Sequence, residues 1–522
     1  MALRVPQNAP PPSKGTDAKV VARNTLVSLL GAVGKASAPL YLAVTTRLYG
    51  IELFGIFVTA QALCELGMTM LTSGFNDAAL MNSAQRAADR ALEEDTDEAR
   101  ARAQENDAHA THMLATSLFW VIALSAGVLL PLAFTTPWAL KPFYEWSDTL
   151  SLILMIMAFG VPLFGLSRIF VASTIGHQDL RFDAIVNGIV RPGSLLVGAL
   201  VYHFTIGGAV AIALAWTTSQ ACGFLVALYG FLRYESVSVL VGALRAKGLE
   251  PSVLRFAVPQ SLSVSFQRFA GSLGLIMLGM MGVSSALVGI FGAALQIVEN
   301  AIYTVRYVFT NVFNPWVPRY LRSGARGELS NLVTDLATQS TIACGAVTIA
   351  LALFEREVMA LFVPDYPGSE GTFAALLIGP WLIGAFGLMG SVIVLAGHSA
   401  INLMNTAIVF TINLTLNLLW IPIYGPLGAA LGTAVATVVL CVLQAYQARR
   451  LEKVTWRMRA FLAPLLGTSA LIAGAIAVAN GWTMIFGLRL AIGMVFALAL
   501  ALVWWSRPRL AELTPPPPVE GP

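Results

Sequence analysis

Two charged residues lie within an apolar stretch of the sequence that is long enough to cross a membrane as a helix. Residues 288–309 read VGIFGAALQIVENAIYTVRYVF and include Glu299 and Arg306. A charge at the centre of a transmembrane helix costs roughly 2.5–3.5 kcal/mol on insertion scales. Seven residues make nearly two helical turns, so the two side chains share a face about 10 Å apart. The spacing predicts a polar stripe that faces something other than lipid.

Further basic residues lie inside other apolar runs. We expect Lys35, Arg268 and Arg306 to line a water-filled cavity, with structural ion pairing as the alternative. Arg191 precedes a Pro-Gly pair that loosens its helix, and we include it in the cavity, although a structural partner fits equally well. Such a cavity is cationic. A phosphate or diphosphate group suits the bidentate donors of arginine.

Two acidic residues, Glu65 and Glu299, lie clearly inside apolar runs. An acid in a membrane span is a candidate proton or sodium site, and we predict ion coupling at both positions. The alternative is that each glutamate only neutralises a neighbouring cation.

The composition is typical of a membrane protein, and the sequence lacks the motifs of an enzyme. It has 522 residues, of which 57% are hydrophobic and 11% charged, against about 25% charged in soluble domains. The net charge of +4 is small and dispersed, which disfavours nucleic-acid binding. The four cysteines are far apart, so we expect no disulfide framework and no metal site. We find no phosphate loop or nucleophile–base pair, and expect no enzyme activity and no cofactor beyond a coupling ion.

Apolar runs of about 20 residues predict an all-α polytopic membrane protein with fourteen transmembrane helices. We place them at 24–47, 52–73, 111–134, 149–172, 184–203, 208–231, 253–279, 286–313, 331–354, 372–396, 402–421, 426–447, 460–479 and 483–505. The turn-forming stretches YHFTIGGA and IPIYGPLGAA predict tight hairpins between neighbouring helices.

The distribution of basic residues in the loops gives the orientation. With the N-terminus in the cytoplasm, only Arg47, Lys141 and Arg356 fall in outside loops, whereas all other loop Lys and Arg residues fall inside. This asymmetry follows the positive-inside rule and predicts that both termini are cytoplasmic.

The chain contains an internal repeat. FGIF from residue 54 matches VGIF from residue 288, and Glu65 matches Glu299, both at an offset of 234. Further along, AIV at residue 184 matches AIV at residue 407, at an offset of 223. The offset is smaller after the charged segment 84–108, as expected if that segment is an insertion in the first copy. Six helices per copy is an even number, which predicts two lobes of the same orientation with a cavity between them.

The repeat divides the chain into predicted domains. These are a cytoplasmic tail at 1–23, an N-lobe at 24–231 with a solvated cytoplasmic insertion at 84–108, a linker at 232–252, a C-lobe at 253–447, two further helices at 460–505 and a Pro-rich tail at 506–522.

Two stretches carry a family resemblance. LYGIELFG from residue 48 and NLTLNLLWIPIYGPLGAALGTAVATVV (Asn413–Val439) resemble polysaccharide-transport (Wzx-type) flippases of the multidrug/oligosaccharidyl-lipid/polysaccharide exporter superfamily. The resemblance covers roughly residues 20–450. It implies a two-lobed, alternating-access transporter that moves an undecaprenyl-diphosphate-linked oligosaccharide across the bacterial inner membrane. Segment 84–108 departs from the family pattern.

The resemblance implies cationic-cavity and ion-coupling roles for five positions, Lys35, Arg268, Arg306, Glu65 and Glu299. It also implies polysaccharide polymerase or export machinery as partners, and we expect a monomer. Three alternatives remain: a lipid II flippase, a drug or metabolite exporter of the same fold, and a non-transporting scaffold for envelope assembly.

Overall fold

A computed structural model of the chain describes residues 37–91, 114–125, 141–144, 146–177, 179–235, 251–314, 317–322, 324–363 and 371–481, with isolated positions elsewhere. The described residues form two compact units. Unit 1 lies within Met1–Tyr41, Leu63–Lys141 and Ser147–Leu262, and unit 2 within Leu42–Ala62, Pro142–Trp146 and Ser263–Pro522. The lobe boundaries drawn from the repeat stay a prediction.

Eleven helices in the described part of the chain are long and apolar enough to cross a membrane, and each coincides with a predicted span. Predicted span 24–47 is described only from Ser37 onward, span 111–134 mainly as the shorter helix Leu114–Leu124, and span 483–505 at two isolated positions. The structure therefore confirms an all-helical, multi-pass membrane protein, whereas the total of fourteen helices stays a prediction.

Three helices divide between the units. They are α2 (Ser37–Tyr49), α3 (Ile51–Ala91) and α12 (Pro251–Met280). Helix α3 continues well beyond the predicted span 52–73 and enters the charged insertion 84–108. Its last two turns are rich in Ala and Arg and contain no Gly or Pro, which favours continuation of the helix. The remainder of the insertion lies outside the described residues.

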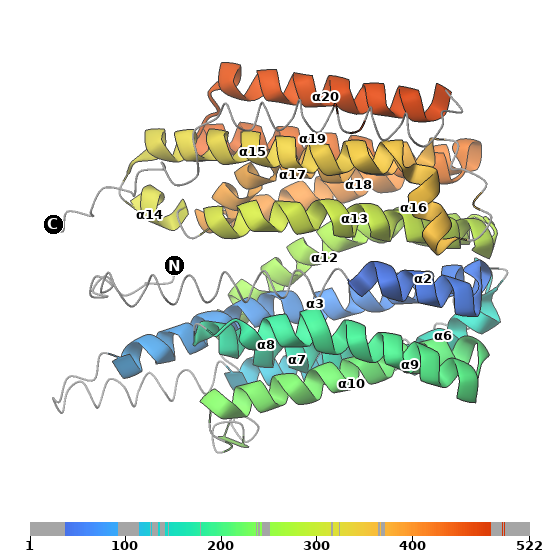
Figure 1. The fold of residues 1–522 in the computed structure, drawn as a ribbon. Coiled ribbons are helices and arrows are strands. Elements are labelled where there is room, and N and C mark those ends of the chain that lie inside the picture. Colours follow the sequence, from blue (N-terminus) through green and yellow to red (C-terminus); the bar gives the residue numbers. More distant parts are fainter. Residues whose placement is uncertain are drawn as a thin grey trace. The chain divides into compact units, whose positions relative to one another are not determined.

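Unit 1 is built around one central helix. Its further helices are α6 (Ser147–Ala158), α7 (Gly160–Gly176), α8 (Arg181–Asp183), the π-helix η2 (Ala184–Val190), α9 (Arg191–Thr205) and α10 (Gly208–Tyr234). Helix α10 contacts α6, α7 and α9, and α7 and α9 run beside it in Figure 1. Apolar side chains of α7 and α10, including Ile169, Phe170 and Phe231, form the core.

Unit 2 is a layered helical bundle. It comprises α13 (Ser285–Phe313), α14 (Val317–Arg322), α15 (Arg326–Leu353), α16 (Glu355–Phe362), α17 (Thr372–Leu395), α18 (Ser399–Tyr424), α19 (Pro426–Glu452) and α20 (Met458–Gly481). Helix α17 contacts α13, α15 and α19, and α20 lies along α15 (Figure 1). The bundle thus gives α17 three long neighbours.

Both predicted hairpins are confirmed. Only Gly425 separates α18 from α19, and its φ of 57° lies in the left-handed region that glycine adopts without strain. Ile206 and Gly207 alone separate α9 from α10.

The repeated Gly-Ile-Phe motifs bring two helices of unit 2 into backbone contact. A Cβ atom at Gly55 of α3 would overlap the Ser285 carbonyl oxygen and lie 2.7 Å from the Gly289 amide nitrogen. A Cβ atom at Gly289 of α13 would likewise overlap the Ile51 carbonyl oxygen. Only glycine at both positions allows α3 and α13 to cross this closely.

We predict that Gly55→Ala destabilises the protein by about 1–3 kcal/mol, because its methyl group overpacks a backbone contact. The measurement is the thermal unfolding of detergent-purified protein. Gly474→Ala in α20 is the matched control, since nothing lies within 4 Å of a Cβ atom there. Equal unfolding temperatures for the two variants would contradict the close crossing.

Candidate functional site

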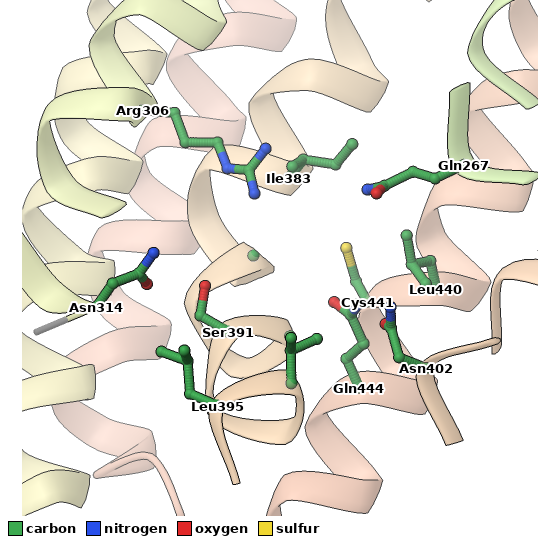
Figure 2. Close-up of a pocket in the computed structure, with 13 residues that line it drawn as sticks. Gln267, Arg306, Asn314, Ile383, Ser391, Leu395, Asn402, Leu440, Cys441 and Gln444 are labelled. Atoms are coloured by element: carbon green, nitrogen blue, oxygen red, sulfur yellow. The ribbon is translucent and has the colours of Figure 1, made fainter. Parts of the chain in front are cut away.

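A polar pocket opens within unit 2, with a cavity volume of about 210 Å³. Five helices contribute to it, namely α12, α13, α17, α18 and α19. The lining residues are Gln267, Arg306, Asn314, Ile383, Gly387, Gly390, Ser391, Val394, Leu395, Asn402, Leu440, Cys441 and Gln444. Figure 2 shows that polar side chains from different helices surround a common space.

Among the described residues, Arg306 is the only charged one in this lining. Its guanidinium lies against the backbone of α17, where a Cβ atom at Gly387 would sit 3.1 Å from Nη2. The Tyr303 ring lies one turn earlier on α13, with its centroid 5.9 Å from the Arg306 Cζ. Among the described residues, the guanidinium makes no hydrogen bond or ion pair. Its donors are therefore available to an anion.

Glu299 and Arg268 join Arg306 around Tyr303. The charges of Glu299, Arg306 and Arg268 all act on the Tyr303 hydroxyl. Glu299, Tyr303 and Arg306 follow one another at helical spacing on α13. The Glu299 carboxylate reaches α12, where its Oε1 lies 3.8 Å from the position of a Cβ atom at Gly271. The cluster contains two cations and one acid, which favours an anionic guest.

The other predicted site residues do not line this pocket. Lys35 lies outside the described residues. Glu65 is half-buried on the part of α3 that belongs to unit 1. Their predicted cavity and coupling roles stay predictions.

Arg191 belongs to a hydrogen-bonded network within unit 1. Its Nη1 donates to Asn187 Oδ1 at 2.6 Å, and its Nη2 donates to the Ser167 hydroxyl. Asn187 in turn donates to Asp183 Oδ1 at 2.7 Å. The guanidinium also lies 4.4 Å from the centroid of the Phe164 ring. The contacts observed for Arg191 are therefore those of a structural partner.

Sequence reasoning missed the amide side chains of the pocket, which are Gln267, Asn314, Asn402 and Gln444. Each is a polar residue within or at the end of an otherwise apolar helix, and this was the available signal. Isolated amides are too common at helix contacts for the sequence alone to distinguish a pocket residue from a packing residue.

His177 and Asp179 lie in the loop between α7 and α8, and both contact Tyr234 at the end of α10. Asp179 is 2% exposed and accepts hydrogen bonds from Arg181 at 2.8 Å and from the Tyr234 hydroxyl. The His177 ring stacks on Tyr234 and lies 3.6 Å from buried Glu235. The loop is buried because the end of α10 folds against it.

Comparison with known proteins identifies the family of the chain and solved structures of similar fold. A family model described as "Polysaccharide biosynthesis protein" matches residues 21–321, which is more than half of the chain. No curated protein matches the chain in sequence.

Three solved structures share the fold. One is described as "Lipid II flippase MurJ, inward closed conformation"; it is 13% identical with a TM-score of 0.65, and the match covers 92% of this chain and 99% of that one. A second is a complex of the "MATE multidrug transporter DinF-BH", at 19% identity and a TM-score of 0.64, covering 88% and 100%. A third is a multidrug resistance MATE family transporter in an inward-facing conformation, at 16% identity and a TM-score of 0.56, covering 84% and 98%. Identities this low establish a common fold alone.

We predict that Gly387→Ala weakens the binding of inorganic pyrophosphate several-fold, because the added methyl group crowds the Arg306 guanidinium. Gly379→Ala on the same helix is the matched control, since its nearest neighbour would lie at an ordinary 3.4 Å. Binding is measured on the purified chain by titration calorimetry. Unchanged affinity in both variants would show that the guanidinium position does not matter for anion binding.

Asp179 gives a second prediction, about acid stability. Burial by itself would raise the pKa of Asp179, but hydrogen bonds from Arg181 and Tyr234 lower it from 3.8 to about 2. A lowered pKa means that the ionised carboxylate stabilises the fold above its ordinary pKa, and that this stabilisation is lost as the pH falls towards 2.

Asp179→Asn should therefore unfold at a lower temperature than wild type at neutral pH, and the difference should shrink as the pH falls below about 4. Intrinsic tryptophan fluorescence during heating measures this. Exposed Asp148→Asn is the control. A difference that does not change with pH would contradict the assignment.

Proposed function

Because the chain belongs to the polysaccharide biosynthesis protein family, we propose that it is a flippase for an undecaprenyl-diphosphate-linked oligosaccharide repeat unit. It acts in the bacterial cytoplasmic membrane, with both termini in the cytoplasm, during assembly of a surface polysaccharide. Transport follows ion-coupled alternating access within a single chain, and polysaccharide polymerase or export machinery takes up the product.

The observation that carries the proposal is the Arg306 guanidinium, which faces a pocket without a hydrogen-bond or ion-pair partner among the described residues. A cation kept this way inside an apolar helix is costly unless a ligand or water surrounds it. A phosphate group of a lipid diphosphate supplies the acceptor oxygens that guanidinium binds in bidentate fashion.

Glu299 is the acid closest to this cation along α13, and we assign it the coupling role. Its carboxylate lies between α12 and α13, and its charge acts on the same Tyr303 hydroxyl as those of Arg306 and Arg268. Binding of a proton or sodium ion at Glu299 would remove a negative charge from the cluster and so favour binding of the diphosphate. Release of that ion would have the opposite effect.

A drug exporter of the same fold is the main competing function. A cationic drug would need an acidic pocket, whereas Arg306 is the only charged residue that the described part of the chain contributes to the lining. The sign of the pocket charge favours an anionic substrate.

The proposal predicts that Arg306→Gln lowers flipping by about tenfold or more, since a hydrogen bond to a charged group contributes about 1.5–3 kcal/mol. The gene is deleted from its host, and lipid-linked sugars are extracted from cells that carry wild type or Arg306→Gln. The variant should accumulate lipid-linked oligosaccharide and lose surface polysaccharide.

Arg450→Gln is the matched control. Arg450 is an exposed arginine on α19 outside the pocket lining, where it donates to the Tyr446 hydroxyl. This variant should restore normal lipid-linked pools. Unchanged pools in the deletion strain, together with new sensitivity to cationic dyes, would instead support a drug exporter.

A further inference from the structure

The pocket offers more than a charge. Beside Arg306, its polar lining consists of uncharged side chains, namely Gln267, Asn314, Ser391, Asn402 and Gln444. Amides and hydroxyls both donate and accept hydrogen bonds, whereas a guanidinium only donates. A ligand that matches this lining must itself carry donors as well as acceptors.

Asn314 is the first of these uncharged side chains, and its amide oxygen can only accept a hydrogen bond. It ends α13, and its Oδ1 is buried without a hydrogen-bond partner in the described part of the chain. An amide oxygen accepts hydrogen bonds and cannot donate one. A fully ionised phosphate has no N–H or O–H group to offer. Because Asn314 lines the pocket, a hydroxyl or amide donor on a different part of the ligand matches its oxygen.

Gln444 presents a second amide on the opposite side of the pocket from Arg306. Its side chain is more than nine-tenths buried, and no hydrogen bond joins its amide to any described residue. Its position is set by packing, since a Cβ atom at Gly390 would lie 2.6 Å from Nε2 and 2.7 Å from Oε1. Figure 2 shows the Gln444 side chain entering the pocket from a helix other than that of Arg306. Because Gln444 lines the pocket, its amide donors and acceptor face a ligand bound there.

We infer that the pocket recognises the sugar residue next to the phosphate, with Asn314 and Gln444 hydrogen-bonded to its hydroxyl or acetamido groups. This inference rests on the proposed function and adds a specificity role for the two amides. The cavity volume of about 210 Å³ is below the roughly 300–1,000 Å³ of pockets for drug-sized ligands. It therefore holds one sugar residue rather than the oligosaccharide.

The test compares two probes on the detergent-purified full-length protein, inorganic phosphate and N-acetylglucosamine 1-phosphate. Titration calorimetry measures both affinities. Asn314→Leu and Gln444→Leu each remove an amide at similar volume. Each should weaken binding of the sugar phosphate by about threefold to tenfold, the size of one hydrogen bond, and leave inorganic phosphate unchanged.

Gln220→Leu is the matched control, because Gln220 is a buried glutamine of unit 1 whose Oε1 also lacks a partner among the described residues. It should alter neither affinity. Equal weakening of both probes by the two pocket variants, or no weakening of either, would overturn the sugar-reading role and leave the anion site in place. If Arg306→Gln changed neither affinity, or if wild type bound neither probe, the proposed pocket itself would be wrong.

Discussion

A charge inside an apolar helix must be surrounded by something other than lipid, and this constraint organises both units. The Arg191 guanidinium is surrounded by protein, since it contacts Asn187, Ser167 and the Phe164 ring within unit 1. The Arg306 guanidinium instead lines a pocket, and its hydrogen-bond donors face the pocket space. The same residue type in the same kind of helix thus has two different consequences. Of these two arginines, Arg306 is the one that lines the pocket.

Helix α17 makes that pocket possible through three glycines. A Cβ atom at Gly384 would lie 2.7 Å from the Cys344 sulfur, one at Gly387 would lie 3.1 Å from the Arg306 guanidinium, and one at Gly390 would lie 2.6 Å from the Gln444 amide. Steps of three residues rotate the position by about 60° around the helix, so each glycine faces a different neighbour. One helix therefore admits a packing residue, a cation and an amide side by side.

The sequence was sufficient for what depends on local pattern. Length and apolarity located the eleven described spans, turn residues located the hairpin at Gly425, and the spacing of Glu299 and Arg306 placed them on one face. Arg191 and Arg306 could not be separated, because the difference lies in the side chains of other helices. The pocket positions of Asn314 and Gln444 could not be predicted for the same reason. Whether an amide lines a pocket depends on side chains from other helices that are distant in the sequence.

The repeat itself has a packing reason that the alignment of its two copies did not reveal. Gly55 and Gly289 occupy equivalent positions in the Gly-Ile-Phe motifs, and each lies against the backbone of the helix that carries the other. A side chain at either position would clash with the backbone of the opposite helix. The close packing of the two motifs therefore requires glycine in both copies. Because this crossing sets how closely the start of α13 approaches α3, it also fixes the helix that carries Glu299 and Arg306. The motif that revealed the repeat in the sequence thus holds the functional helix in place.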